Sequence, residues 1–151
     1  MQFMRPSRVW QLGLLLATLC LAIAATARTG RDFSGYFDVS GVQEQGDFVQ
    51  VTLHLKLFNH GDEDARSVIV TLMDSSSPTL MLRGNFQPVK VWKSQHFIEL
   101  SQEFSIPKSD FNVWMRPAAQ PNLIILYRDA QGKTLQVGPQ VSRRPLVPMG
   151  E

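Results

Sequence analysis

The sequence has a single cysteine, Cys20, which lies within an apolar run near the amino terminus. A chain that begins after this run has no cysteine, which excludes a disulfide-stabilised scaffold and a thiolate metal site. The core must then be stable without cross-links, as a domain of about 110 ordered residues can be.

An excess of charge of either sign is also missing. The chain has 15 Lys and Arg and 13 Asp and Glu, and Arg5 and Arg8 are the only charged residues before residue 28. The remainder therefore has thirteen of each sign and a formal net charge of zero. Its longest run of like charge is Asp62-Glu63-Asp64. Because nucleic-acid binding requires a basic surface, no nucleic-acid partner is expected.

The amino-terminal segment has the three parts of a secretory signal peptide. Arg5 and Arg8 precede the apolar run Leu12–Ala24, and Ala25 and Ala27 supply the small side chains of a cleavage site. We predict a signal peptide over residues 1–27, cleavage after Ala27, and a secreted or periplasmic protein with no membrane span after cleavage. The alternative is an uncleaved anchor, although the run is shorter than the ~20 residues that cross a bilayer comfortably.

The clearest pattern in the remaining chain is the stretch Phe48–Met73. Its first half alternates apolar residues from Val49 to Leu57 with polar ones, and this period of two predicts a strand with one buried face. Asn59-His60-Gly61-Asp62 has the composition of a turn, and Ser67–Met73 is a second strand that returns. The stretch therefore predicts a sheet with one buried face.

Further short strands follow at intervals typical of an all-β domain. We expect strands at Gly35–Val42, Thr79–Leu82, Val89–Trp92, His96–Ile106, Asn122–Arg128 and Thr134–Val141, with an irregular segment over Phe111–Pro121. The apolar run Leu123–Tyr127 predicts a central strand covered on both sides. We predict an immunoglobulin-like antiparallel β-sandwich of about seven strands over residues 28–142, preceded by the signal peptide helix and followed by a disordered tail over 143–151.

Two parts of the sequence carry a family resemblance. The apolar alternation from Val49 to Leu55, Asn59-x-Gly61 and Val68-x-Val70-x-Leu72 resemble the second and third strands of bacterial immunoglobulin-like domains of the CARDB-like, cell-adhesion-related type. Leu126–Lys133 is similar to their final hairpin. The resemblance implies a sandwich fold and a role in contacts with partners, and it implies no catalytic residues.

The polar residues do not form a catalytic or metal-binding pattern. His54, His60 and His96 lack metal-ligand spacing and are interpreted as solvated surface residues. Asp62-Glu63-Asp64 offers oxygen ligands to calcium but lacks the spacing of a calcium loop, so a solvated acidic turn is favoured. Ser75-Ser76-Ser77 has no neighbouring base or nucleophile elbow. The protein is therefore expected to be a non-enzyme without a cofactor.

The tryptophans leave one ligand-binding hypothesis open. Burial of Trp92 and Trp114 at the ends of the sandwich is favoured, and Trp114 with Arg116 is the first place to look for a small ligand. We expect an exported interaction module that contacts a protein or a cell-envelope component. The alternative is a small secreted carbohydrate-binding module that uses exposed aromatic residues.

Overall fold

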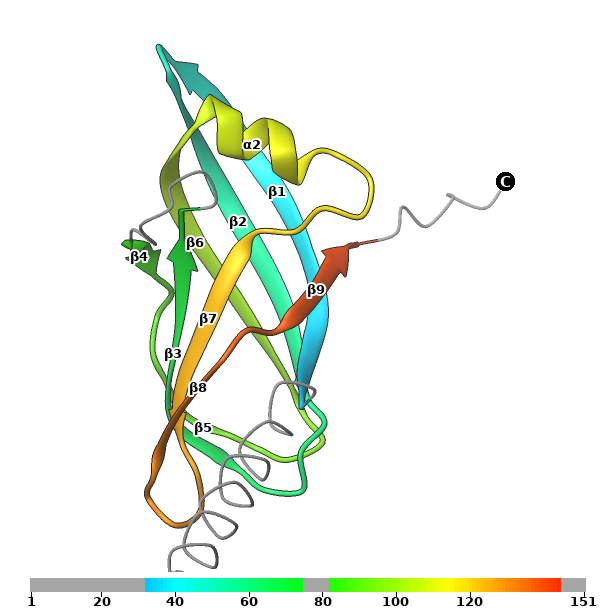
Figure 1. Ribbon diagram of the computed structural model, residues 1–151, viewed down its shortest axis with the longest axis vertical. Coiled ribbons are helices and arrows are strands. Elements are labelled where there is room, and N and C mark those ends of the chain that lie inside the picture. The colour runs from blue at the N-terminus through cyan, green and yellow to red at the C-terminus, as the bar shows by residue number, and fades with distance from the viewer. Residues whose placement is uncertain (1–31, 75–81, 145–151) are drawn as a thin grey trace, which may run out of the picture.

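Two β-sheets pack face to face in the computed structural model, which describes residues 32–74 and 82–144 (Figure 1). The elements are β1 (Phe33–Gln45), β2 (Phe48–Asn59), β3 (Ala65–Met73), β4 (Leu82–Asn85), β5 (Val89–Trp92), β6 (Phe97–Pro107), α2 (Lys108–Trp114), β7 (Asn122–Arg128), β8 (Thr134–Val137) and β9 (Gln140–Arg143). The predicted all-β sandwich is confirmed.

The last predicted strand is divided in the structure. The first sheet has the order β6-β2-β1-β9, and the second has the order β4-β3-β7-β8 with β5 also paired to β3. The predicted single strand Thr134–Val141 is two strands, because Gly138-Pro139 interrupts it: β8 pairs with β7, and β9 crosses to β1. The β1–β9 pair is parallel, so the expectation of a purely antiparallel sandwich is wrong at this edge.

The hairpin between β1 and β2 is longer than predicted. The polar residues from Gln43 to Gln45 continue β1, and only Gly46 and Asp47 form the turn. Gly46 has φ +61°, a conformation that suits a tight hairpin. A bulge between Ser40 and Gln43 contains Gly41, with φ +62°.

The alternation in β2 correctly predicts which of its faces is buried. Val49, Val51, Leu53, Leu55 and Leu57 are all buried, and β2 lies between β1 and β6. Large aromatic side chains complete the core: Phe33, Phe37, Phe86, Trp92 and Trp114.

A short helix occupies part of the segment predicted to be irregular. The helix α2 begins after Pro107, has no side-chain cap, and packs against β6 and β2 at one end of the sandwich. Its Asp110 and Trp114 are buried. Two helical turns are too few to produce a recognisable apolar period, so the pattern could not reveal the helix.

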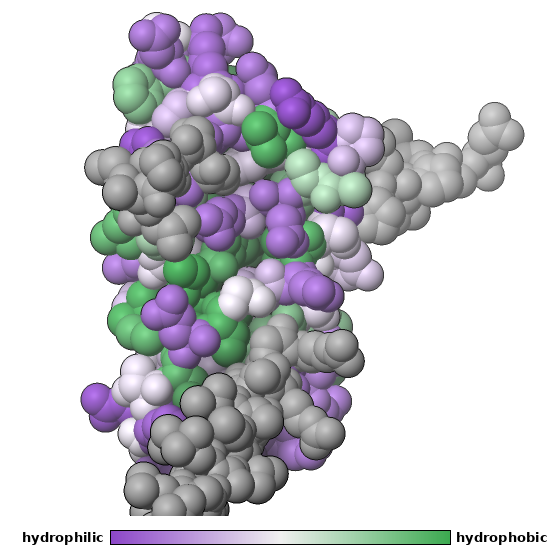
Figure 2. Space-filling model, in the orientation of Figure 1, coloured by the Kyte–Doolittle hydropathy of each residue, from purple (hydrophilic) through white to green (hydrophobic). Residues whose placement is uncertain are grey.

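The strand β7 is covered on one face only, contrary to the prediction. Leu123, Ile125 and Tyr127 point into the core, whereas Ile124 is half-buried and Leu126 is 37% exposed. Figure 2 shows apolar residues gathered over this side of the molecule. The helix does not shield this face because it lies at the end of the sandwich (Figure 1).

The boundary predicted between the domain and its tail falls within a strand, and several other predictions concern residues that the structure does not describe. Ser142 and Arg143, one on each side of the boundary predicted between domain and tail, both belong to β9. Ala25 and Ala27, Ser75 to Ser77, and residues 145–151 lie outside the described residues. Within 32–74 and 82–144, no helix is both long and apolar enough to span a bilayer.

Candidate functional site

Trp114 and Arg116, the pair predicted to be the first place for a small ligand, differ in exposure. Trp114 is 1% exposed and Trp92 is fully buried, so the favoured interpretation of both as core residues is confirmed. Arg116 is exposed on the loop after α2. Neither tryptophan ring is therefore available at the surface to stack on a sugar.

The histidines were predicted to be solvated surface residues, but their rings contact neighbouring residues at hydrogen-bond distance. The half-buried His54 is held between two serines, with Nε2 at 2.7 Å from Ser40 Oγ and Nδ1 at 2.7 Å from Ser101 Oγ. His60 and His96 are exposed, but His60 Nε2 lies 2.6 Å from Ser34 Oγ. The strand pairing brings these partners together, so sequence spacing could not show them.

The pair Ser40–His54 has the atoms of a nucleophile and a base, but its surroundings differ from a catalytic triad. Such a triad needs a third group that orients the base. Here the second ring nitrogen of His54 meets the Ser101 hydroxyl, and the Asp38 carboxylate accepts the backbone N–H of Val39 at 2.8 Å. Among the described residues, His54 therefore belongs to a serine–histidine–serine row on the sheet surface that includes no orienting carboxylate.

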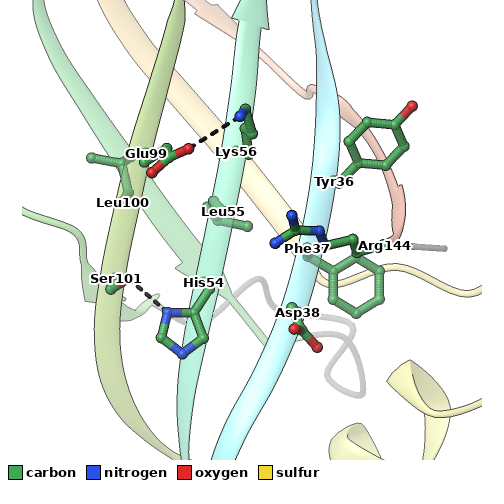
Figure 3. Close-up of a pocket in the computed structure, with 10 residues that line it drawn as sticks. All are labelled: Tyr36, Phe37, Asp38, His54, Leu55, Lys56, Glu99, Leu100, Ser101 and Arg144. Carbon is green, nitrogen blue, oxygen red and sulfur yellow. Dashed lines mark hydrogen bonds and ion pairs between the residues drawn. The ribbon is translucent and has the colours of Figure 1, made fainter. Parts of the chain in front are cut away.

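Cross-strand rows of polar side chains cover the outer face of the first sheet. Lys56 stands between Tyr36 and Glu99 in register, and its Nζ lies 3.2 Å from Glu99 Oε1. These residues surround a shallow hollow of about 220 Å³ with Arg144 at its rim (Figure 3). Because the ion pair is exposed, it contributes only about 0.5 kcal/mol to stability.

An aromatic groove continues this face toward β9. We define it by Tyr36, Phe58 and Phe97, which line a cavity of about 780 Å³ together with His60. The side chains of Tyr36 and Phe97 are 46% and 57% exposed. The far wall comes from the loop after α2 and from β9, through Ala118, Gln120, Gln140, Val141 and Ser142.

The pattern of β2 contained an overlooked signal for this groove. Phe58 shares the polar phase of His54 and Lys56, so an apolar residue stands on the outward face. Phe97 on β6 pairs with Phe58 on β2. It likewise points outward, because it alternates with the inward-pointing Leu100. Large apolar side chains on the solvent phase of a strand indicate a contact surface.

A second cavity lies at the end of the sandwich where the turn Asp62-Glu63-Asp64 is found. These residues are joined by Asp32, which precedes β1, and Asp129, which follows β7, around a volume of about 320 Å³. We call this the acidic cavity. The calcium hypothesis fits it poorly, because no group of three His, Cys, Asp or Glu in the described ranges could hold a metal ion.

Two titratable groups of the acidic cavity have shifted pKa values. A hydrogen bond from Lys93 Nζ at 2.9 Å, with a second from the Ser94 N–H, lowers the pKa of the Asp64 carboxyl. Burial raises the pKa of the Tyr127 hydroxyl, and the negative charges of Asp32, Asp129 and Glu63 raise it further.

Comparison with known proteins does not identify a family. No family model matches the sequence, and no curated protein is significantly similar to it. The solved structures that match include two of a GH20 exo-β-N-acetylglucosaminidase from Vibrio harveyi. One is of an inactive D437A mutant, with a TM-score of 0.45, and the other is in complex with N-acetylglucosamine, with a TM-score of 0.43; both match at 18% identity. The structural genomics target SoR45 matches at 5% identity and TM-score 0.41, over 79% of this chain and 91% of its own.

The shared portion of the glycosidase is small. Each match covers 74% of this chain, which spans only 18% of the length of the glycosidase.

Proposed function

We propose that the protein is an exported, non-enzymatic interaction domain that binds a partner protein through the aromatic groove. The observation that supports this is the pair Phe58–Phe97 on the outer face of the first sheet, with ring centroids 4.7 Å apart. Exposed aromatic side chains beside a concavity are typical of contact surfaces, because they bury much apolar area when a partner docks.

The shape of the groove favours a protein side chain over a sugar ring. Phe58 and Phe97 are inclined to one another by 58°, so they form a notch and not the flat platform that a pyranose ring stacks on. Lys56 Nζ lies 4.9 Å from the centre of the Phe97 ring and fixes it from one side. A notch of this kind accommodates an aliphatic or aromatic side chain of a partner.

The edge strand β9, which forms the far wall of the groove, provides main-chain groups for the same partner. β9 is the last strand of its sheet, and Arg144 donates its N–H to Phe37 O on the β1 side. Alternation then directs the N–H groups of Val141 and Arg143 to the open edge, where Gln120 Oε1 accepts that of Val141 at 3.0 Å. An extended partner segment that displaced Gln120 would pair with this edge, while a different part of the same partner fills the notch, which lies beyond β1 on β2 and β6.

Site-specific photo-crosslinking in cells that produce the protein tests this proposal. A benzophenone side chain at position 97 is expected to yield one discrete adduct, and Tyr36→Ala in the same chain is expected to reduce it strongly. The control places the crosslinker at Phe48, which is 44% exposed on β2 but lies at the far end of the sheet. Equal adduct yields from both positions, or an undiminished adduct yield in Tyr36→Ala, would contradict the proposal.

A further inference from the structure

The acidic cavity has more negative charge than the protein itself neutralises. Of its carboxylates, Asp64 is paired with Lys93, and Asp129 accepts the N–H groups of Gln131 and Lys133 at 3.0 and 2.8 Å. Over the described ranges, the carboxylates of the other three, Asp32, Asp62 and Glu63, have no hydrogen-bond or ion-pair partner. Carboxylates gathered around one cavity repel each other, so a cation bound among them is stabilised.

Tyr127 supplies a second and independent sign of a ligand. Its side chain comes from β7 and is only 7% exposed, yet it lines the acidic cavity, with its ring edge-on to Phe33 at 5.1 Å. Within the described part of the chain no side chain or backbone group bonds to its hydroxyl. The ring is buried while the hydroxyl remains accessible from the cavity, so its oxygen offers an acceptor to whatever occupies the cavity.

Part of the remaining lining is apolar, and the cavity leaves room for a side chain. Phe33, Ala65 and Leu135 form part of the wall. The volume of about 320 Å³ far exceeds the roughly 10–15 Å³ that a single water requires on a comparable measure. A ligand with a cationic head and an aliphatic stem matches both kinds of surface, because the stem packs on the apolar wall while the charged head stays among the polar groups.

The distribution of acceptors distinguishes a planar cation from a metal ion. No set of three carboxylates in the described ranges converges on a point where a metal could sit. The acceptors are instead spread around the cavity on three segments: Asp32, the turn 62–64 and the end of β7. A guanidinium has five N–H donors spread in a plane, whereas an ammonium or a metal ion concentrates its charge at one point.

We propose that the acidic cavity binds the guanidinium group of an arginine side chain presented by a partner protein. Asp32 and Glu63 accept its N–H groups, and Tyr127 accepts a further one through its hydroxyl oxygen. The site and the Phe58–Phe97 notch both adjoin the start of β1, but no residue lines both cavities, so the two proposals are tested independently.

Heteronuclear NMR titration of the isotope-labelled protein with the probe peptide acetyl-Gly-Arg-Gly-amide tests the assignment. Backbone amide shifts are expected to concentrate at residues 61–65 and 127–135, and to weaken as salt is added. The matched peptide with citrulline in place of arginine keeps the shape but removes the charge, and is expected to bind at least tenfold more weakly. A lysine peptide is expected to fall between the two. Agmatine serves as a free guanidine, and is expected to bind no more tightly than the arginine peptide.

Charge-removing variants locate the site. Asp32→Asn combined with Glu63→Gln is expected to weaken the arginine peptide about tenfold, since hydrogen bonds to a charged group are among the stronger ones. Glu103→Gln, on β6, is the control and is expected to leave binding unchanged. Citrulline binding as tightly as arginine, shifts confined to the outer face of the first sheet, or a lack of response to the double variant would overturn the proposal. Tighter binding of agmatine than of the peptide would overturn the assignment to a partner protein.

Discussion

The side-chain oxygen of Asn59 accepts the backbone N–H of Gly61 at 2.9 Å, and this bond shapes the turn that leaves β2. The same side chain donates through Nδ2 to Glu63 O at 3.0 Å and to Lys93 O at 3.4 Å. Asn59 is 1% exposed, so one buried amide connects the turn to the loop before β6. This turn also places Glu63 at the acidic cavity.

Replacing this amide is expected to destabilise the fold. Asn59→Ala leaves the Gly61 N–H and the acceptors around it without their partner, which costs about 2 kcal/mol of unfolding free energy. Urea unfolding measures the change. Asn85→Ala is the matched control, because Asn85 is exposed and accepts a bond only from Thr71 Oγ1, at 2.7 Å; a loss under about 0.5 kcal/mol is expected there. Equal losses in the two variants would contradict the role assigned to Asn59.

The two buried tryptophans are expected to respond differently to the same substitution. Trp92 Nε1 donates to His96 O at 2.9 Å, whereas Trp114 Nε1 is buried without a partner among the described residues. Both Trp→Phe variants lose volume, but only Trp92→Phe loses a hydrogen bond. We expect Trp92→Phe to cost about 1 kcal/mol more, measured by thermal or urea unfolding. A larger loss for Trp114→Phe would show that its indole N–H has a partner.

Stability at alkaline pH is expected to depend on Tyr127. Its pKa in the folded protein is raised, first by burial and then by the charge of Asp32, above the value of about 10 in an unfolded chain. The unfolded chain therefore loses this proton first as the pH rises. Tyr127 thus contributes stability that is complete below about pH 10 and is lost as the pH rises through its folded pKa.

Urea unfolding from pH 8 to 11 on the native protein and on Tyr127→Phe checks this linkage. Phenylalanine cannot ionise, so the variant is expected to lose less stability over the alkaline part of this range. Asp32→Asn is expected to lower the pKa of Tyr127 in an absorbance titration, because it removes a neighbouring negative charge. Parallel pH profiles for the native protein and Tyr127→Phe would contradict the assignment.

Gly35 is expected to tolerate no side chain. A Cβ at this position of β1 would overlap the carbonyl oxygen of Lys56 on the neighbouring strand, and backbone cannot yield as a flexible side chain does. Gly35→Ala is expected to cost about 3 kcal/mol or to prevent folding. Gly46→Ala is the comparison: φ is +61° but nothing lies within 4 Å, so only about 1 kcal/mol of backbone strain is expected. Urea unfolding distinguishes the two, and a near-neutral Gly35→Ala would contradict the close approach.

The sequence pattern predicted where the strands lie better than it predicted what packs against them. The alternation of β2 identified its buried face because that pattern reflects burial directly. The apolar residues of β7 were assigned two covered faces, but only the structure shows that Leu126 is exposed on the outer face. The segment around Trp114 was predicted to be irregular because the two turns of α2 leave no visible period.

The acidic cavity could not be predicted for a different reason. Only the turn Asp62-Glu63-Asp64 is continuous in sequence, and it resembles any solvated acidic loop. Asp32 reaches it because Phe33 pairs with Asn59, and Asp129 reaches it because Arg128 pairs with Arg66. Long-range strand register creates the site, and no local pattern encodes that register between distant strands.

Export is the remaining expectation that a direct measurement can decide. Signal peptidase requires small side chains at two positions before the cut, which Ala25 and Ala27 provide. The intact mass of the secreted or periplasmic protein is expected to correspond to a chain that begins at Arg28. Ala25→Leu with Ala27→Leu is expected to leave the full-length chain at the membrane, whereas Ala22→Leu, which keeps the run apolar, is expected to be processed normally. A full-length native chain in the membrane fraction would instead establish the uncleaved anchor.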